Sequence, residues 1–352
     1  MNRNRWLDFR CFAVAGIIAT TMACAPESRP KSESPDIKNF VLEEKDTWVR
    51  PTDCRANIAK AMCVVDPTKE GEDNKPRTCL GGEAPYAHVF EELYDNYPPA
   101  LQKMFCSIRF IFVENKLLST AYAGTATDKD DKQLPGVYLG IRRSIVDSGM
   151  TYAQWSTWKE QLNFGGRNDS YDFIPQVLPV YSFKIKKKLN DFLYSVVAHE
   201  FGHFFDFGND VNEFKAGNCK EENEDCMASS AWSKLSWKTM KIPLESQDYS
   251  YRYRLCFYRC TEVLAPDILE ELYTGLDHTN FISSYASTNP WDDFAETVNY
   301  LTSLNYLQAR AKVAAGKKGV VLDITSKLKS SRFKAKRAFV ENLLTSKELK
   351  YP

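Results

Sequence analysis

Residues 196–206, VVAHEFGHFFD, place two of the chain's four histidines four positions apart in an apolar setting. Positions i and i+4 lie on the same face of an α-helix, so His199 and His203 can direct two imidazole nitrogens to one point. Glu200 lies at the edge of that face, where it can reach a metal-bound water without binding the metal. This spacing is typical of a zinc site on a helix, although H-E-x-x-H also occurs by chance in core helices.

The residues around this motif predict a long, buried helix. Asn190 or Asp191 can cap its start, and Gly208 can end it in the left-handed conformation. Gly202 leaves room for a closely packed neighbour. The remaining sides of the helix carry Phe201, Phe204 and Phe205. Two buried histidines without partners would be unfavourable, and a metal ion would satisfy both.

A catalytic zinc site has three protein ligands and one open position. Neither of the other histidines, His88 and His278, has suitable spacing. The better source of a third ligand is 283–301, SSYASTNPWDDFAETVNYL. In that stretch Asp292 and Glu296 are four apart, so a second helix can present a carboxylate to the two histidines.

The spacing does not select one acid. Asn289 can cap this second helix and Pro290 can take its first position. Acidic residues in a first helical turn also interact favourably with the helix dipole, which gives them a purely structural role. Asp292, Asp293 and Glu296 therefore all remain candidate ligands.

The two blocks HEFGHFFD and SSYASTNPWDDFAE resemble the catalytic domain of anthrax lethal factor and the Pro-Pro endopeptidases. They resemble more closely a family of zinc-binding metallopeptidases of bacterial envelope lipoproteins. The likeness is confined to these blocks, and the linker between them is longer here than in lethal factor. It implies an α+β zincin-like domain, in which a small twisted sheet packs on the H-E-x-x-H helix and the C-terminal half is mainly helical.

The resemblance also implies roles for individual residues. The acid seven positions after the tyrosine is the third ligand, which is Asp292, and Tyr285 lends its hydroxyl to the oxyanion. Glu296 supports the site, and Asp206 orients a ligand histidine, although an exposed acid at the helix end is an equal alternative. The usual ligand in these families is glutamate. Either the second helix therefore sits closer here, or Glu296 replaces Asp292 as the ligand.

The first 24 residues predict an export signal. A positively charged start is followed by the apolar run CFAVAGIIATTMA, which is too short to span a bilayer, and then by Cys24. Residues 21–24, TMAC, are similar to a bacterial lipobox, so we expect a lipid on Cys24. An ordinary cleaved signal or a retained anchor is the alternative. Residues 25–46 are expected to be a flexible tether. The protein is thus expected in the bacterial cell envelope, held by a lipid, or secreted.

Cysteine usage agrees with export. Of ten cysteines, Cys11 lies in the signal and Cys24 at its end, which leaves eight. An even number in an exported chain favours disulfides, here expected within the first four and within the last four. The eight are Cys54, Cys63, Cys79, Cys106, Cys219, Cys226, Cys256 and Cys260. A cysteine zinc site is the alternative, but their spacing does not favour it.

The chain is expected to divide into a cysteine-rich N-terminal region at 47–85 and a catalytic domain at 86–352, with an insertion at 209–260. Residues 47–85 could also be a removable pro-segment. Hydrophobic alternation predicts strands, and helical periodicity predicts helices. The strands are expected at 107–118, 136–146 and 177–185. The helices are expected at 151–162 and 265–276, and one long helix runs from 289 to Gly316. The strand at 136–146 is expected to bind an extended substrate.

Together these features predict a secreted or lipid-anchored zinc endopeptidase that acts on proteins or peptides, with Glu200 as general base. The formal net charge is zero, which gives no reason to expect a nucleic-acid partner. The alternatives are a non-catalytic, zinc-stabilised surface lipoprotein that acts as a binding module, and a metal hydrolase that acts on other envelope material.

Overall fold

The computed structural model describes residues 37–42, 45–68, 77–80, 85–117, 119–130, 132–166, 178–212, 226–258, 262–316 and 319–352. The predicted signal, the predicted lipid site Cys24 and residues 25–36 of the predicted tether lie outside these ranges. The described chain is α+β, as predicted. None of its described helices combines the length and the apolar character that crossing a membrane requires.

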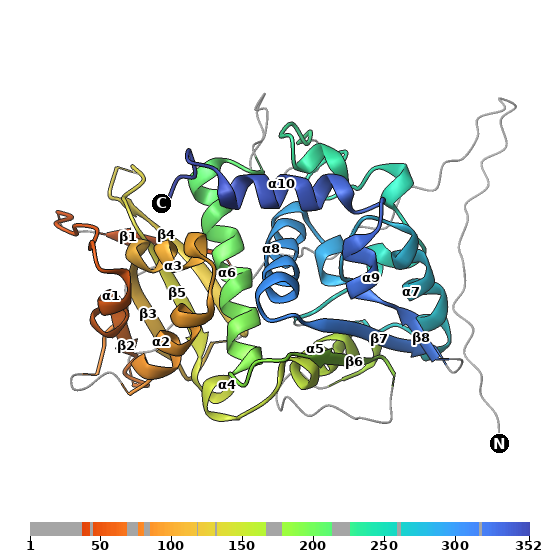
Figure 1. Ribbon diagram of the computed structural model, residues 1–352, viewed down its shortest axis with the longest axis horizontal. Helices are drawn as coiled ribbons and strands as arrows, with labels where there is room; N and C mark the ends of the chain where they lie inside the picture. Colours follow the sequence, from red (N-terminus) through yellow and green to blue (C-terminus); the bar gives the residue numbers. More distant parts are fainter. Residues whose placement is uncertain are drawn as a thin grey trace, which may run out of the picture. The chain divides into compact units, whose positions relative to one another are not determined.

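The N-terminal half contains a mixed five-stranded sheet in the order β1-β4-β5-β3-β2 (Figure 1). Strands β1 and β4 run in one direction, and β5, β3 and β2 run in the other. Their bounds are β1 (Ile37–Leu42), β2 (Met62–Val64), β3 (Ile108–Glu114), β4 (Ala121–Asp128) and β5 (Val137–Arg142).

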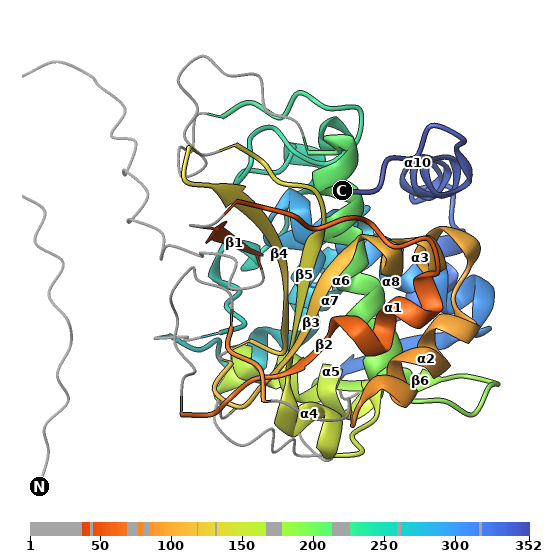
Figure 2. The ribbon, with the colours of Figure 1, turned by 90° about the vertical axis from the view of Figure 1, so that its left-hand side faces the viewer.

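Four helices share a core with one face of this sheet (Figure 2). They are α1 (Cys54–Ala61), α2 (Ala87–Asn96), α3 (Pro99–Met104) and α6 (Asp191–Asn209). Alternate strand residues such as Ile111 and Leu139 point into this core, as the two-residue period of a strand requires. The intervening aromatic residues Phe112, Tyr122 and Tyr138 form a second cluster on the other face.

The C-terminal half combines helices with a second sheet, antiparallel throughout, in the order β6-β7-β8. The strands of this sheet are β6 (Val180–Lys184), β7 (Arg310–Gly316) and β8 (Gly319–Leu322). The helices of this half are α7 (Leu269–His278), α8 (Pro290–Tyr306), α9 (Ile324–Lys329) and α10 (Lys334–Thr345). Two further helices, α4 (Arg143–Asp147) and α5 (Tyr152–Gln161), lie between β5 and β6 in the chain. Helix α8 lies beside α6, so that α6 runs between the first sheet and α8 (Figure 1).

Short 3₁₀ turns link these elements at η1 (Phe105–Ser107), η2 (Leu162–Phe164), η3 (Ser233–Leu235), η4 (Glu245–Gln247), η5 (Arg252–Arg254), η6 (Pro266–Ile268) and η7 (Tyr285–Ser287). Residues 226–258, within the predicted insertion, are otherwise mostly irregular. They nevertheless bury Trp232 and Trp237 completely or nearly so, so this segment belongs to the core.

The predicted boundary at residue 86 is wrong, because both sides of it share one sheet. Strand β2 pairs in parallel with β3, which lies beyond the boundary. Two disulfides, Cys54–Cys106 and Cys63–Cys79, add covalent links within the first set of four cysteines, as predicted. Cys226 and Cys256 are disulfide-bonded as well, while Cys219 and Cys260 lie outside the described residues.

The predicted tether is also too long, because residues 37–42 form β1. Phe40 on this strand is fully buried between the aromatic rings of Phe112, Tyr122 and Tyr138. Gly124 on β4 provides the space, since a Cβ there would lie 2.8 Å from the Phe40 ring. This anchoring fixes β1 to the edge of the sheet.

The predicted helix from 289 to Gly316 is wrong in its second part. Helix α8 ends at Tyr306, and the following turn includes Gln308 at φ 52°. Residues 310–316 alternate between exposed and buried positions and form β7 between β6 and β8. The C-terminal half is therefore less helical than predicted. Similarly, α6 continues through Gly208, and Asp210 takes the left-handed position.

Candidate metal centre

Helix α6 carries the H-E-x-x-H motif and is buried along most of its length. Asn190 caps it by accepting a hydrogen bond of 2.9 Å from the backbone nitrogen of Leu193. Gly202 faces α8, and a Cβ at this position would lie only 2.5 Å from the Cα of Ala295. The glycine therefore allows α8 to approach α6 closely, as predicted, and brings the N-terminal turn of α8 to the histidines.

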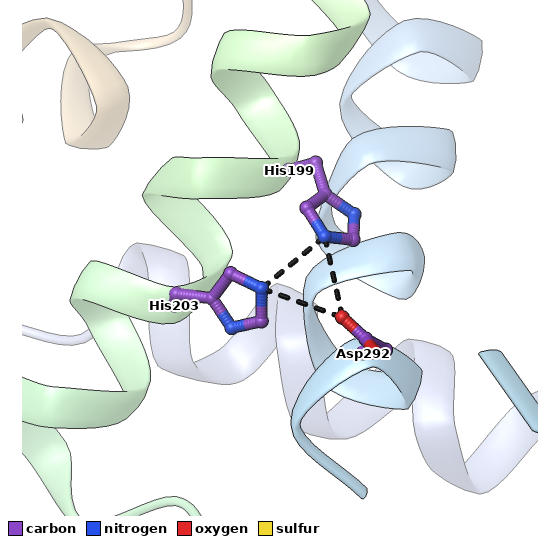
Figure 3. A group of neighbouring side chains, drawn as sticks. All are labelled: His199, His203 and Asp292. Carbon is purple, nitrogen blue, oxygen red and sulfur yellow. Dashed lines mark hydrogen bonds and ion pairs between the residues drawn. The ribbon is translucent and has the colours of Figure 1, made fainter. Parts of the chain in front are cut away.

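The first turn of α8 fixes the orientation of Asp292. Asn289 caps the helix by accepting a hydrogen bond of 2.8 Å from the Asp292 backbone nitrogen. Its side-chain nitrogen also donates to Asp292 Oδ2 at 2.6 Å. The other carboxylate oxygen, Oδ1, is buried and accepts no hydrogen bond from the described residues. It lies instead toward the two imidazoles (Figure 3).

His199, His203 and Asp292 form a compact triangle of donor atoms (Figure 3). The two Nε2 atoms are 3.2 Å apart, and Asp292 Oδ1 lies 3.6 Å from His199 Nε2 and 3.5 Å from His203 Nε2. Tetrahedral bonds of about 2.0–2.1 Å to zinc place neighbouring ligand atoms about 3.3–3.4 Å apart. The triangle matches that spacing, so this buried group could hold a metal ion. Two imidazoles and a carboxylate suit zinc, and they also suit other divalent transition metals.

The charges in the group are consistent with a cation site. Burial alone would lower the pKa of His199, but its interactions with the carboxylates of Asp292 and Glu296 outweigh burial and raise that pKa to about 10. Burial likewise opposes ionisation of Asp292, yet its interactions with both histidines hold its pKa well below the usual range. Burial lowers the pKa of His203. The two carboxylates thus favour positive charge at His199, as they would favour a bound cation.

Glu296 lies on the opposite side of the His199 ring from the triangle. Its Oε1 is 3.0 Å from His199 Nδ1, and its Oε2 accepts a hydrogen bond of 2.7 Å from Ser283. This arrangement directs the Nε2 atom of His199 toward Asp292 and His203. Within the described part of the chain, the group that could hold a metal includes Asp292 and not Glu296.

A small pocket, with room for about one water molecule, opens beside His199. Glu200 and Glu296 line it, and so do Ala121 at the start of β4 and Lys159 on α5. Among the described residues that line the pocket, Lys159 is the only lysine or arginine. No sequence pattern singles out Lys159, because a charged residue on a helix usually faces solvent.

Tyr285 lies beside the metal group, on η7. Its ring centroid is 5.9 Å from that of His199, and the side chain is almost completely buried. The Phe257 ring packs edge-on against it, with centroids 4.9 Å apart. The structure thus places the Tyr285 ring next to that of His199.

Asp206 makes different contacts from those expected. Its two carboxylate oxygens accept hydrogen bonds from Asn212, one from the backbone nitrogen at 2.8 Å and one from the side chain at 2.6 Å. The Asn212 side chain also donates to the Pro290 carbonyl at 3.1 Å. Asp206 therefore ties the end of α6 to the start of α8. The predicted role of orienting a histidine is not seen among its described contacts, and neither is the alternative of an exposed acid.

The remaining candidates lie apart from the triangle. Asp293 is buried in an ion pair with Lys336, whose Nζ is 2.6 Å from each of its carboxylate oxygens. Both His88 and His278 are exposed, so neither contributes to the buried group. Strand β5, predicted to bind substrate, is paired on both edges with β4 and β3, so its backbone cannot accept a further strand.

Comparisons with protein-family models, with curated proteins and with solved structures found no match to this chain.

Proposed function

We propose that this protein is a zinc-dependent endopeptidase. The observation that carries the proposal is the triangle of His199, His203 and Asp292, with Glu200 on the same helix lining the adjoining pocket. Two histidines and an acid leave one position open on a tetrahedral ion, which is the arrangement of catalytic zinc sites. The resemblance of the two sequence blocks to zincin metallopeptidases supports the same conclusion.

Each residue of the site has a definite role in this proposal. A zinc ion bound here would lower the pKa of a water molecule and polarise the scissile carbonyl. Glu200 accepts the proton of the attacking water and passes it to the leaving amine. Tyr285 donates its hydroxyl proton to a hydrogen bond with the developing oxyanion. Glu296 holds the His199 ring in place through Nδ1, and Asn289 holds the Asp292 carboxylate.

The alternative of a purely structural zinc site requires a fourth protein ligand. Across the described ranges, only the three residues of the triangle are grouped closely enough to hold an ion. The cysteines in those ranges form disulfides and cannot coordinate zinc as thiolates. These observations favour a catalytic site over a structural one.

The proposed setting is the bacterial envelope. A lipid on Cys24 would hold the enzyme at a membrane, where protein or peptide substrates reach it. The disulfides are consistent with an oxidising compartment. This part of the proposal depends on the N-terminal sequence and is separate from the chemistry of the site.

Replacing Glu200 with glutamine tests the proposed chemistry. We expect the wild type and Glu200→Gln each to bind one zinc per chain, and Glu200→Gln to lose at least about a hundredfold in peptide hydrolysis. The measurements are metal content by elemental analysis and digestion of a peptide library. Glu271→Gln, an exposed change on α7, is the matched control and keeps wild-type activity. Hydrolysis by Glu200→Gln at the wild-type rate would refute the assignment.

A further inference from the structure

Helix α5 contributes a buried cation to the site. Only 6 % of the Lys159 surface is exposed, and the residue lines the pocket beside His199 and Glu200. Burial of an ammonium group is unfavourable unless its surroundings compensate. Here four aromatic rings surround the ammonium, and their faces attract cations. They belong to Trp155, Phe257, Tyr258 and Tyr285.

The contact with Tyr285 is much the closest of the four. Lys159 Nζ lies 3.1 Å from the centroid of the Tyr285 ring, compared with 4.8 Å for Trp155 and more than 5 Å for the other two. At that distance the ammonium rests on the face of the ring. A positive charge there withdraws electron density from the phenol, which strengthens the hydroxyl as a hydrogen-bond donor.

Glu160, the residue after Lys159, also links α5 to the start of η7. Glu160 is buried, and it accepts hydrogen bonds from Tyr273 and from Ser284. Ser284 directly precedes Tyr285. Glu160 therefore holds Ser284 through a hydrogen bond, and Lys159 places its ammonium on the ring of Tyr285. Two consecutive residues of α5 thus contact two consecutive residues at the start of η7. This double contact fixes the Tyr285 ring relative to α5.

We propose that Lys159 is a positioning residue that makes Tyr285 an effective oxyanion donor. This inference rests on the proposed peptidase function, and it assigns to Lys159 a role exerted through the tyrosine. Because the oxyanion develops only as the transition state forms, the effect falls on kcat rather than on substrate binding.

A double-mutant cycle tests the proposal. Lys159→Met keeps the aliphatic stem but removes the charge, and Tyr285→Phe keeps the ring but removes the hydroxyl. We expect Lys159→Met to lower kcat about 10- to 30-fold with KM nearly unchanged, and Tyr285→Phe to lower it about 10²- to 10³-fold. The double variant should be no slower than Tyr285→Phe alone. Multiplicative losses would overturn the inference, because Lys159 would then act independently of the hydroxyl.

Controls separate this inference from failure of the proposed function. If Glu200→Gln hydrolyses peptides as fast as wild type, the peptidase assignment fails. If Glu200→Gln is inactive and Lys159→Met has wild-type kcat, only the role of Lys159 fails. Lys329→Met, an exposed change on α9, should match wild type.

Should Lys159→Met not fold, Lys159→Arg and Lys159→Gln replace it. The arginine variant should then keep kcat within a few-fold of wild type, and the glutamine variant should lose about tenfold in kcat. Equal kcat values for the two variants would overturn the proposal.

Discussion

His199 Nδ1 lies 3.0 Å from Glu296 Oε1, while Nε2 on the other side of the same ring points toward His203 and Asp292. The glutamate and the aspartate are one helical turn apart on α8, and they contact opposite sides of one imidazole. Helix α8 therefore supplies both a donor atom of the triangle and the residue that orients another.

This arrangement predicts that Glu296→Gln weakens metal binding without abolishing it. The glutamine can keep a hydrogen bond to the ring but loses the negative charge that increases the basicity of the imidazole. Loss of such a partner typically lowers metal affinity about 10- to 100-fold. Competition with a chromophoric chelator measures the affinity, with Glu271→Gln as control. An affinity equal to that of wild type would show that Glu296 does not orient His199.

Gly202→Ala should loosen the contact between α6 and α8. An alanine in a helix interior usually stabilises a protein by about 0.5–1 kcal/mol relative to glycine. Here the added Cβ would clash with Ala295, and overpacking of this kind costs about 1–3 kcal/mol. We expect a lower melting temperature and weaker zinc binding, since Asp292 would move away from the histidines. A rise in melting temperature would contradict the close approach of the two helices.

Asp206→Asn distinguishes a structural role from a role at the metal. The substitution removes the charge from a buried group that accepts two hydrogen bonds from Asn212, and we expect a loss of about 1–3 kcal/mol in unfolding free energy. Zinc affinity should remain within a few-fold of wild type. If affinity falls as far as in Glu296→Gln, then Asp206 does orient a histidine.

Zinc binding should release a proton. Interactions with the carboxylates of Asp292 and Glu296 outweigh burial and raise the pKa of His199 to about 10 when no metal is bound. We therefore expect the ring to be protonated at pH 7. A ligand imidazole must be neutral, so apparent zinc affinity should rise about tenfold per pH unit from pH 6.5 to 8. Calorimetry in buffers of different ionisation enthalpy measures the protons released. No pH dependence would mean that His199 is already neutral.

The same raised pKa predicts that the stability of the metal-free protein falls as pH rises, whereas zinc affinity rises. The unfolded-state pKa of histidine is about 6.5. Stability from the protonated His199 is therefore fully present below that pH and is lost as pH rises through about 10. Thermal unfolding of chelator-treated protein between pH 6.5 and 10 measures this loss.

Lys336→Met should destabilise the docking of α10 on α8. Both partners of the Lys336–Asp293 ion pair are buried, and Trp237 Nε1 donates to the same carboxylate at 3.0 Å. Removing one member of a buried pair leaves an uncompensated charge and costs about 3–5 kcal/mol. The double variant Lys336→Met, Asp293→Asn should recover part of that loss. Denaturant unfolding would contradict the prediction if the single variant were as stable as wild type.

The local part of the site could be predicted from the sequence, but the choice among its acids could not. The four-residue spacing of His199 and His203 needs only a helix. Selection of Asp292 over Glu296 depends on the distance between two helices, which the contact of Gly202 with Ala295 sets. That contact joins residues far apart in the chain, so no pattern within a single segment reveals it.

The sequence also did not predict β7, β4 or the burial of Lys159, because local patterns were weak or distant residues decided the outcome. Residues 310–316, RAKVAAG, have helix-forming side chains, but pairing with β6 and β8 overrides that preference. Strand β4 is built largely from small residues, which give a weak hydrophobic alternation. Lys159 was missed because its burial depends on Phe257, Tyr258 and Tyr285, all more than ninety positions away.

If Cys24 carries the proposed lipid, strand β1 limits how far the folded domain can stand from the bilayer. Because Phe40 locks this strand into the sheet, only residues 25–36 lie between a lipid on Cys24 and the folded domain. A fully extended chain spans about 3.3–3.6 Å per residue, so Ile37 would lie no more than roughly 45 Å from the membrane surface. If the proposed anchor and activity hold, the substrates within reach are those inside this tether length plus the dimensions of the folded domain.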